Sequence, residues 1–176
     1  MSVMIVGGCP GCGKSSVSRL LADSDPRGVH IASDRFFDFL AHKLDPSLPE
    51  AKAQNETVVS AYVTAASIYA DGGYSVYLDG VIGPWLFPLI SPILPHFDFV
   101  LLHAPLDVAL RRVAQRDGQG SATAGVVRRM HHQFSDIICD YQPHLLHTGD
   151  AELEATAGEI RSRLARGELR VPGDRE

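Results

Sequence analysis

The sequence has little that would direct the protein to a nucleic acid or into a membrane. Among 176 residues, 16 Lys and Arg stand against 21 Asp and Glu, a formal net charge of −5. Binding to a polyphosphate backbone needs a basic face, so this balance argues against nucleic acid as a partner. The most apolar stretch, residues 81–95, contains four prolines. It is also shorter than the roughly 20 apolar residues of a membrane-spanning helix, so we predict no membrane span.

Cysteines are also few, and their spacing shows no disulfide framework. There are three, Cys9, Cys12 and Cys139, and an odd count argues against a fully paired set. The chain passes from Met1 into an apolar run without a basic leader segment, so we expect a cytoplasmic protein. Cys9 and Cys12 have C-x-x-C spacing. A redox pair is therefore an alternative to the simpler interpretation that both occupy variable positions of a loop.

Apolar strand-like runs alternate with helical patterns along the chain. We expect strands at residues 3–6, 29–32, 74–78, 97–102 and near 145–146, and helices at 14–22, 34–44, 51–70, 106–116, 126–138 and 151–166. This alternation predicts an α/β fold with a parallel sheet between two layers of helices. The length fits one domain, residues 1–167, followed by a polar tail, residues 168–176, that we expect to fray.

The most specific motif follows the first expected strand and opens the first expected helix. Residues 8–15 match G-x-x-x-x-G-K-[ST], a phosphate-binding loop whose backbone N–H groups surround a phosphate chain. Lys14 places a positive charge at the β- and γ-phosphates, and the Ser15 hydroxyl is placed to bind Mg²⁺. The residues expected to hold ATP here are Gly8, Cys9, Pro10, Gly11, Cys12, Gly13, Lys14, Ser15 and Ser16.

Two aspartates follow other expected strands at the edge of the sheet where ligands bind in open α/β folds. Asp79 ends an apolar strand and can hold the Mg²⁺ shell, although such a residue is also common in ordinary turns. Asp34 follows the second strand and can accept the proton of an attacking hydroxyl. The alternative for Asp34 is a helix N-cap. We favour the catalytic role for Asp34 and the metal role for Asp79.

Two arginines precede a stretch rich in Gly, Ser and Thr, residues 117–125, that we interpret as a lid. Arg112 and Arg116 are four residues apart and therefore share a helix face. Such a pair can stack on adenine and neutralise charge on the transferred phosphate when the lid closes, although single arginines are more often solvated surface residues. We predict that Arg112 contacts the nucleotide and that Arg116 is catalytic.

A guanine-nucleotide switch is excluded because its Asn-Lys-x-Asp motif is absent. The single asparagine, Asn55, lies between Gln54 and Glu56. Cations are also scarce between residues 29 and 95, where an acceptor pocket would form: Arg35, Lys43 and Lys52 are the Lys and Arg there. Enzymes that phosphorylate nucleoside monophosphates need several arginines for the acceptor phosphate. The acceptor is therefore expected to be uncharged.

Together these motifs resemble the small P-loop kinases that include chloramphenicol phosphotransferase, gluconate kinase and the tunicamycin-resistance protein. The resemblance runs from residue 3 to about residue 166 and implies a five-stranded parallel sheet in nucleotide-kinase order with a short lid. In the chloramphenicol enzyme, an Asp after the second strand acts as general base, and Asp34 matches it. In adenylate-kinase-like relatives, the first lid arginine packs against adenine and the second meets phosphate. Arg112 and Arg116 match them in spacing.

The resemblance does not extend to the acceptor. The acidic segment of gluconate kinases that ends in Arg-x-Pro-Trp-Leu is missing, and residues 83–86, Gly-Pro-Trp-Leu, match only part of it. We expect an ATP- and Mg²⁺-dependent kinase that phosphorylates a hydroxyl of a small, uncharged molecule such as a nucleoside, a sugar or an antibiotic. The alternative is a protein that binds nucleotide and sequesters a toxic compound without turnover.

Overall fold

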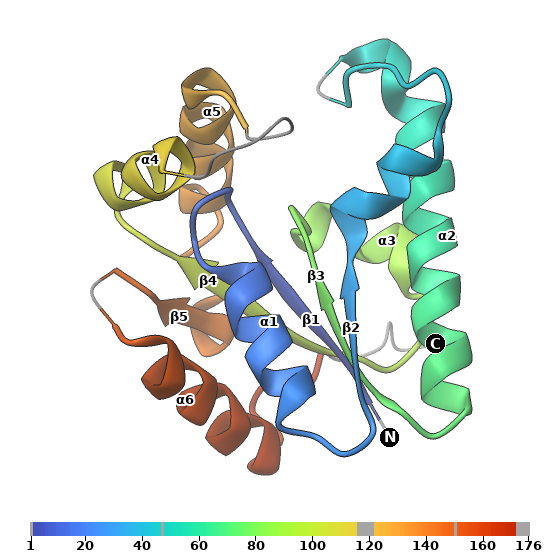
Figure 1. Ribbon diagram of the computed structural model, residues 1–176, viewed down its shortest axis with the longest axis vertical. Coiled ribbons are helices and arrows are strands. Elements are labelled where there is room, and N and C mark those ends of the chain that lie inside the picture. Colours follow the sequence, from blue (N-terminus) through green and yellow to red (C-terminus); the bar gives the residue numbers. More distant parts are fainter. Residues whose placement is uncertain (1, 47, 116–121, 150, 172–176) are drawn as a thin grey trace.

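A computed structural model describes residues 2–46, 48–115, 122–149 and 151–171. Its centre is one five-stranded sheet in the order β2-β3-β1-β4-β5, and all strand pairs are parallel (Figure 1). The strands are β1 (Val3–Gly8), β2 (Gly28–Ala32), β3 (Ser75–Asp79), β4 (Asp98–His103) and β5 (Leu145–His147). This order confirms the predicted five-stranded parallel sheet.

Helices cover the sheet and extend beyond its carboxyl edge. The α-helices are α1 (Lys14–Asp23), α2 (Lys52–Asp71), α3 (Phe87–Ile90), α4 (Leu106–Ala114), α5 (Ala124–Ser135) and α6 (Leu153–Ala165). The short 3₁₀ helices are η1 (Ser33–Phe39), η2 (Pro49–Ala51), η3 (Pro84–Leu86) and η4 (Gln142–His144). In Figure 1, the helix pair α4–α5 and the pair η1–α2 rise on the two sides of the loop between β1 and α1. Within the described residues, no helix is long and apolar enough to cross a membrane.

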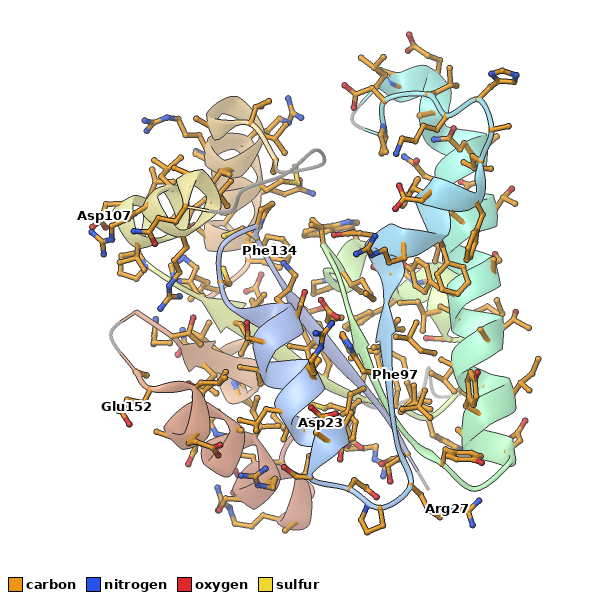
Figure 2. The ribbon with its side chains drawn as sticks, in the orientation of Figure 1. Asp23, Arg27, Phe97, Asp107, Phe134 and Glu152 are labelled. Atoms are coloured by element: carbon orange, nitrogen blue, oxygen red, sulfur yellow. The ribbon has the colours of Figure 1, made fainter. Side chains whose placement is uncertain are left out.

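The core forms on both faces of the central strands. Every residue of β1 is buried, as expected for a strand that has helices on both sides. Phe97, directly before β4, and Phe99 within it are also fully buried, and Phe87 packs edge-on against both. Outside this core, charged side chains such as Asp107 of α4 are exposed (Figure 2). Phe87 thus packs against the core.

The helix expected at residues 34–44 is shorter than predicted and is a 3₁₀ helix, which is wound more tightly than an α-helix. The structure has the 3₁₀ helix η1, which ends when Leu40 becomes extended. Residues three apart eclipse each other in a 3₁₀ helix, and the rings of Phe36 and Phe39 are accordingly 5.5 Å apart. After the predicted lid, whose residues 117–121 lie outside the described part of the chain, α5 begins two residues earlier than expected because Thr123 caps it by accepting a hydrogen bond from the Val126 backbone.

The expected frayed tail is wrong for residues 168–171. Leu169 is fully buried, and its carbonyl accepts a hydrogen bond of 2.8 Å from the Phe99 backbone. Arg170 forms an antiparallel bridge with Asp98 and an ion pair of 3.4 Å with its carboxylate. The polar composition hid two apolar residues: Leu169 is fully buried, and Val171 packs against the core, so this segment is held at the start of β4. Residues 172–176 of the predicted tail lie outside the described part of the chain.

Candidate nucleotide and phosphoryl-transfer site

The phosphate loop has the backbone that its motif predicts. It leaves β1 at Gly8 and enters α1 at Lys14, with Gly13 as the N-cap residue. Gly11 and Gly13 have φ values of 90° and 91°, which side chains rarely permit. No side chain caps α1, so the first N–H groups of this helix remain available to an anion. The loop therefore offers a phosphate the positive end of a helix.

Lys14 is held inside this loop. Its side chain is 7% exposed, and its Nζ donates a 2.9 Å hydrogen bond to the backbone carbonyl of Cys9. A buried ammonium group needs such a partner. A phosphate oxygen arriving at the loop would offer a stronger, charged acceptor in place of a neutral carbonyl. The position of Lys14 thus fits its predicted role at the β- and γ-phosphates.

Ser15 and Asp79 meet beside the loop, although 64 residues separate them in the chain. The Ser15 hydroxyl donates a 2.6 Å hydrogen bond to Asp79 Oδ2. Val6 of β1 and Asp79 of β3 are register partners, and this pairing brings the end of β3 next to the strand that leads into the loop. The two residues predicted to hold the metal are therefore adjacent.

The donor set at this point suits Mg²⁺. This ion prefers oxygen ligands and is commonly held by one or two protein oxygens together with substrate phosphates. The Ser15 hydroxyl and the buried Asp79 carboxylate are such oxygens, and they lie where the first turn of α1 meets the sheet edge. When bound, the ion would offset negative charge on the phosphates. Ser15 and Asp79 would orient it.

His30 is a member of this site that sequence reasoning missed. Its Nε2 lies 2.5 Å from Asp79 Oδ1, so the Asp79 carboxylate is held from both sides, by His30 and by Ser15. His30 comes from β2, where its register partner is Tyr77. The alternation of side chains along a strand does not indicate a contact between His30 and Asp79. The one available signal was a polar residue inside an apolar strand next to the strand that carries Asp79.

Asp34 lies at the same sheet edge, as the second residue of η1. The N-cap residue of η1 is Ala32 and no side chain caps this helix, so the capping alternative for Asp34 is wrong. Solvent reaches the side chain, yet the surrounding protein partly desolvates the carboxyl group and raises its pKa. The charge of Lys14 opposes this shift, while the charges of Asp79 and Asp38 add to it. The charges of Lys14 and Asp79 therefore both influence the pKa of Asp34.

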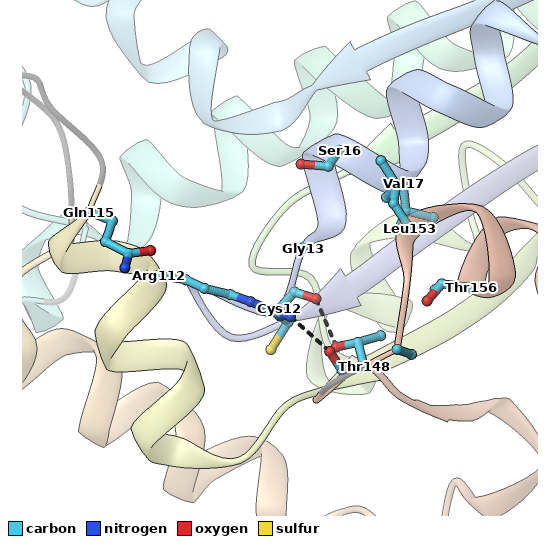
Figure 3. Close-up of a pocket in the computed structure, with 10 residues that line it drawn as sticks. Cys12, Gly13, Ser16, Val17, Arg112, Gln115, Thr148, Leu153 and Thr156 are labelled. Atoms are coloured by element: carbon cyan, nitrogen blue, oxygen red, sulfur yellow. Dashed lines mark hydrogen bonds between the residues drawn. The ribbon is translucent and has the colours of Figure 1, made fainter.

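On the other side of the loop, Arg112 lines a pocket of about 350 Å³ (Figure 3). Its guanidinium donates hydrogen bonds of 3.1 Å to the Thr148 carbonyl and 2.7 Å to the Gly149 carbonyl, and a weaker one of 3.4 Å to the Gly11 carbonyl. Thr148 in turn donates a 2.9 Å hydrogen bond to the Cys12 carbonyl. Arg112 and Thr148 thus tie the phosphate loop to the segment after β5. The pocket residues are Cys12, Gly13, Ser16, Val17, Arg112, Gln115, Thr148, Ala151, Leu153 and Thr156.

The predicted residues therefore divide into two groups around the loop. Asp34, Lys14, Ser15 and Asp79 lie on the side of η1 and β3, whereas Arg112 lies on the side of α4. The pocket includes four of the residues expected to hold ATP, and we interpret it as the space for the nucleoside part. Arg116, predicted to be catalytic, lies outside the described residues.

The strand order, the phosphate loop and its position at the carboxyl edge define the fold of the small P-loop kinase group. Comparison of the sequence with protein-family models gives no match, and comparison with curated proteins gives none. Among solved structures, a sugar kinase from Janibacter sp. HTCC2649 superposes with a TM-score of 0.70 at 16% identity, over 94% of this chain and 95% of that one. A gluconokinase from Sinorhizobium meliloti 1021 gives 0.67 at 16% identity, over 95% and 93%.

The tunicamycin resistance protein of Deinococcus radiodurans gives a TM-score of 0.66 at 16% identity, over 93% of this chain and 95% of that one. Coverage is nearly complete on both sides in these three comparisons, so the likeness concerns the whole fold. At such low identity it shows a shared fold. Function has to be argued from the site.

Proposed function

We propose that the protein is a kinase that transfers the γ-phosphate of ATP to a hydroxyl group of a small, uncharged molecule. The observation that carries this proposal is the convergence of Lys14, the Ser15–Asp79 pair and Asp34 at one sheet edge. Phosphoryl transfer requires positioning and charge stabilisation more than covalent chemistry from the protein. Lys14 would stabilise the phosphates, and Asp34 would accept the proton of the acceptor hydroxyl.

The exposure and the pairing of Arg35, Lys43 and Lys52 support an uncharged acceptor. Arg35 and Lys43 both face the carboxylate of Asp38, and Lys52 faces Glu56 one helical turn away. All three side chains are at least half exposed. None is therefore a buried, unpaired cation of the kind that would bind an acceptor phosphate.

Aromatic side chains near Asp34 support an acceptor with an apolar face. Phe36 packs against Phe39 and against Tyr62 of α2, while Phe39 remains 78% exposed. Burial, together with the negative charge of Asp34, raises the pKa of Tyr62, so its hydroxyl stays protonated near that carboxylate. A nucleoside, glycoside or antibiotic could place the apolar face of a ring on Phe36 and Phe39 and present its hydroxyl to Asp34.

The test is a screen for phosphorylated products by mass spectrometry. Purified protein with Mg-ATP and pooled nucleosides, sugars and antibiotics is compared with the Asp34→Asn variant. A product heavier by one phosphoryl group, absent with the variant, supports the kinase and identifies the acceptor. If ATP and a pool compound both bind but no compound is phosphorylated, the sequestration alternative replaces the proposal.

A further inference from the structure

Cys9 and Cys12 form a pair of buried thiols inside the phosphate loop. Their sulfur atoms are 2.9 Å apart, and each residue is 1% exposed. The backbone between them makes a tight turn, closed by a 3.3 Å hydrogen bond from the Cys12 N–H to the Cys9 carbonyl. Pro10 occupies the second position of this turn and Gly11, with its positive φ, the third, as in a type II turn. The turn therefore holds the two side chains side by side.

We propose that Cys9 and Cys12 are a modification site that forms a reversible disulfide and thereby weakens nucleotide binding. This inference rests on the proposed binding of ATP at the phosphate loop. The sulfur atoms need to approach from 2.9 Å to about 2.05 Å, a shift within the range of small loop adjustments. No rearrangement of separate elements is required, because both residues belong to one turn.

The chemistry of the pair favours Cys12 as the attacking sulfur. The hydrogen bond between the two sulfur atoms lowers the pKa of Cys12, and the charge of Lys14 lowers it further, while the same hydrogen bond and burial raise the pKa of Cys9. Cys12 is also one of the residues that line the pocket. Cys139, the third cysteine, is exposed and belongs to no such pair.

With hydrogen peroxide as oxidant the reaction balances in two steps. The Cys12 thiolate attacks one peroxide oxygen, the O–O bond breaks, and hydroxide leaves with a sulfenic acid on Cys12. The Cys9 sulfur then attacks the Cys12 sulfur, forming the S–S bond and expelling the sulfenic oxygen, which takes up the Cys9 proton as water. The two thiols lose two electrons and two protons, and one peroxide becomes two waters.

Packing around the loop explains why the disulfide would change phosphate binding. A Cβ at Gly11 would lie 2.4 Å from the Ala109 carbonyl, so the turn is pressed against α4 and cannot move that way. Gly13, in contrast, has nothing within 4 Å of such an added atom. The adjustment that closes the sulfur gap therefore falls on Gly13, which leads into the uncapped N–H groups at the start of α1. Displacing these groups weakens the anion site.

The experiment uses the Cys139→Ser protein, in which the pair is the only source of thiols. Intact mass and alkylation before and after hydrogen peroxide report the disulfide as a loss of two hydrogens. Calorimetric ATP affinity is measured for the reduced, oxidised and re-reduced protein. We expect the disulfide to form, ATP affinity to fall within the usual range of coupling between sites, about 5- to 150-fold, and reduction to restore it. Single variants Cys9→Ser and Cys12→Ser should show no loss of two hydrogens.

Coupling is reciprocal, so saturating ATP should slow oxidation of the pair. Two results would overturn the proposal: both thiols still alkylatable after peroxide treatment, or a disulfide that leaves ATP affinity unchanged. The mass measurement needs no nucleotide. If the reduced protein fails to bind ATP, the proposed function and the proposed effect on binding are both wrong. The mass measurement still shows whether the disulfide forms.

Discussion

His30 Nε2 and Asp79 Oδ1 are 2.5 Å apart, and this contact joins the outer strand β2 to the carboxylate beside the phosphate loop. The other oxygen of Asp79 accepts the Ser15 hydroxyl hydrogen bond. Both oxygens thus have a partner before any ligand arrives, and the carboxylate has little freedom to rotate. In metal sites generally, mutating a partner that orients a ligand typically lowers metal affinity about 10- to 100-fold.

Replacing His30 by Ala should therefore weaken Mg²⁺-dependent ATP binding. We expect the Mg²⁺ concentration needed for half-maximal binding to rise about 10- to 100-fold, because Asp79 loses the group that orients it. Titrating Mg²⁺ at fixed ATP in a calorimeter measures this directly. His96→Ala, at an exposed histidine, is the matched control. Equal Mg²⁺ requirements in both variants would show that His30 has no positioning role.

Asp34 should set the acidic limb of the pH–rate profile. A base works when deprotonated, so kcat/KM should rise with pH as the carboxyl loses its proton. Because the pKa of Asp34 is raised, this limb should lie above the usual range of aspartates. Asp34→Asn should lower kcat/KM by roughly 10²–10⁴-fold and leave ATP affinity largely intact.

Asp38→Asn is the informative companion to that variant. Asp38 is about half exposed, and its negative charge contributes to the raised pKa of Asp34. Removing this charge should move the acidic limb to lower pH while activity at the plateau persists. A limb that does not move, measured at equal ionic strength, would show that another group controls it.

Arg112 should matter more for ATP affinity than its neighbour Arg111. Arg112→Lys loses the planar guanidinium, whose Nη2 donates to the Thr148 and Gly149 carbonyls and whose Nη1 donates to the Gly11 carbonyl. Hydrogen bonds from charged groups contribute about 1.5–3 kcal/mol each, so we expect ATP affinity to fall roughly 10- to 100-fold. The control Arg111→Lys alters a side chain that is 58% exposed and should change affinity little. Calorimetry with ATP compares the two, and equal losses would contradict a specific role for Arg112.

Leu169 should stabilise the whole domain although it lies near the end of the chain. Its side chain is fully buried, so Leu169→Ala should lower the free energy of unfolding by about 2–5 kcal/mol. Leu44→Ala, at a leucine that is 46% exposed, should change it by less than about 0.5 kcal/mol. Urea unfolding followed by circular dichroism measures both. Similar small changes would mean that residues 168–171 detach without cost.

The sequence predicted best where local pattern controls structure. The fully apolar run of β1 and the glycines at positions 11 and 13 indicate a buried strand and a loop with positive φ, and both are present. Prediction was weaker where packing overrides propensity. Residues 34–44 look helical, yet η1 stops at Phe39. The polar tail hides Leu169 and Val171, because two apolar residues among polar ones are too few to establish a period.

By itself, then, the sequence determined the class of fold and the phosphate loop, because glycines, a buried strand and a helix start act over a few neighbouring residues. Tertiary structure alone decided that His30 holds Asp79, that Arg112 ties the loop to Thr148, and that the Cys9 and Cys12 sulfurs lie 2.9 Å apart. The first two contacts depend on strand register and loop packing between distant segments. The third depends on the side-chain directions within one folded turn, which spacing in a sequence does not specify.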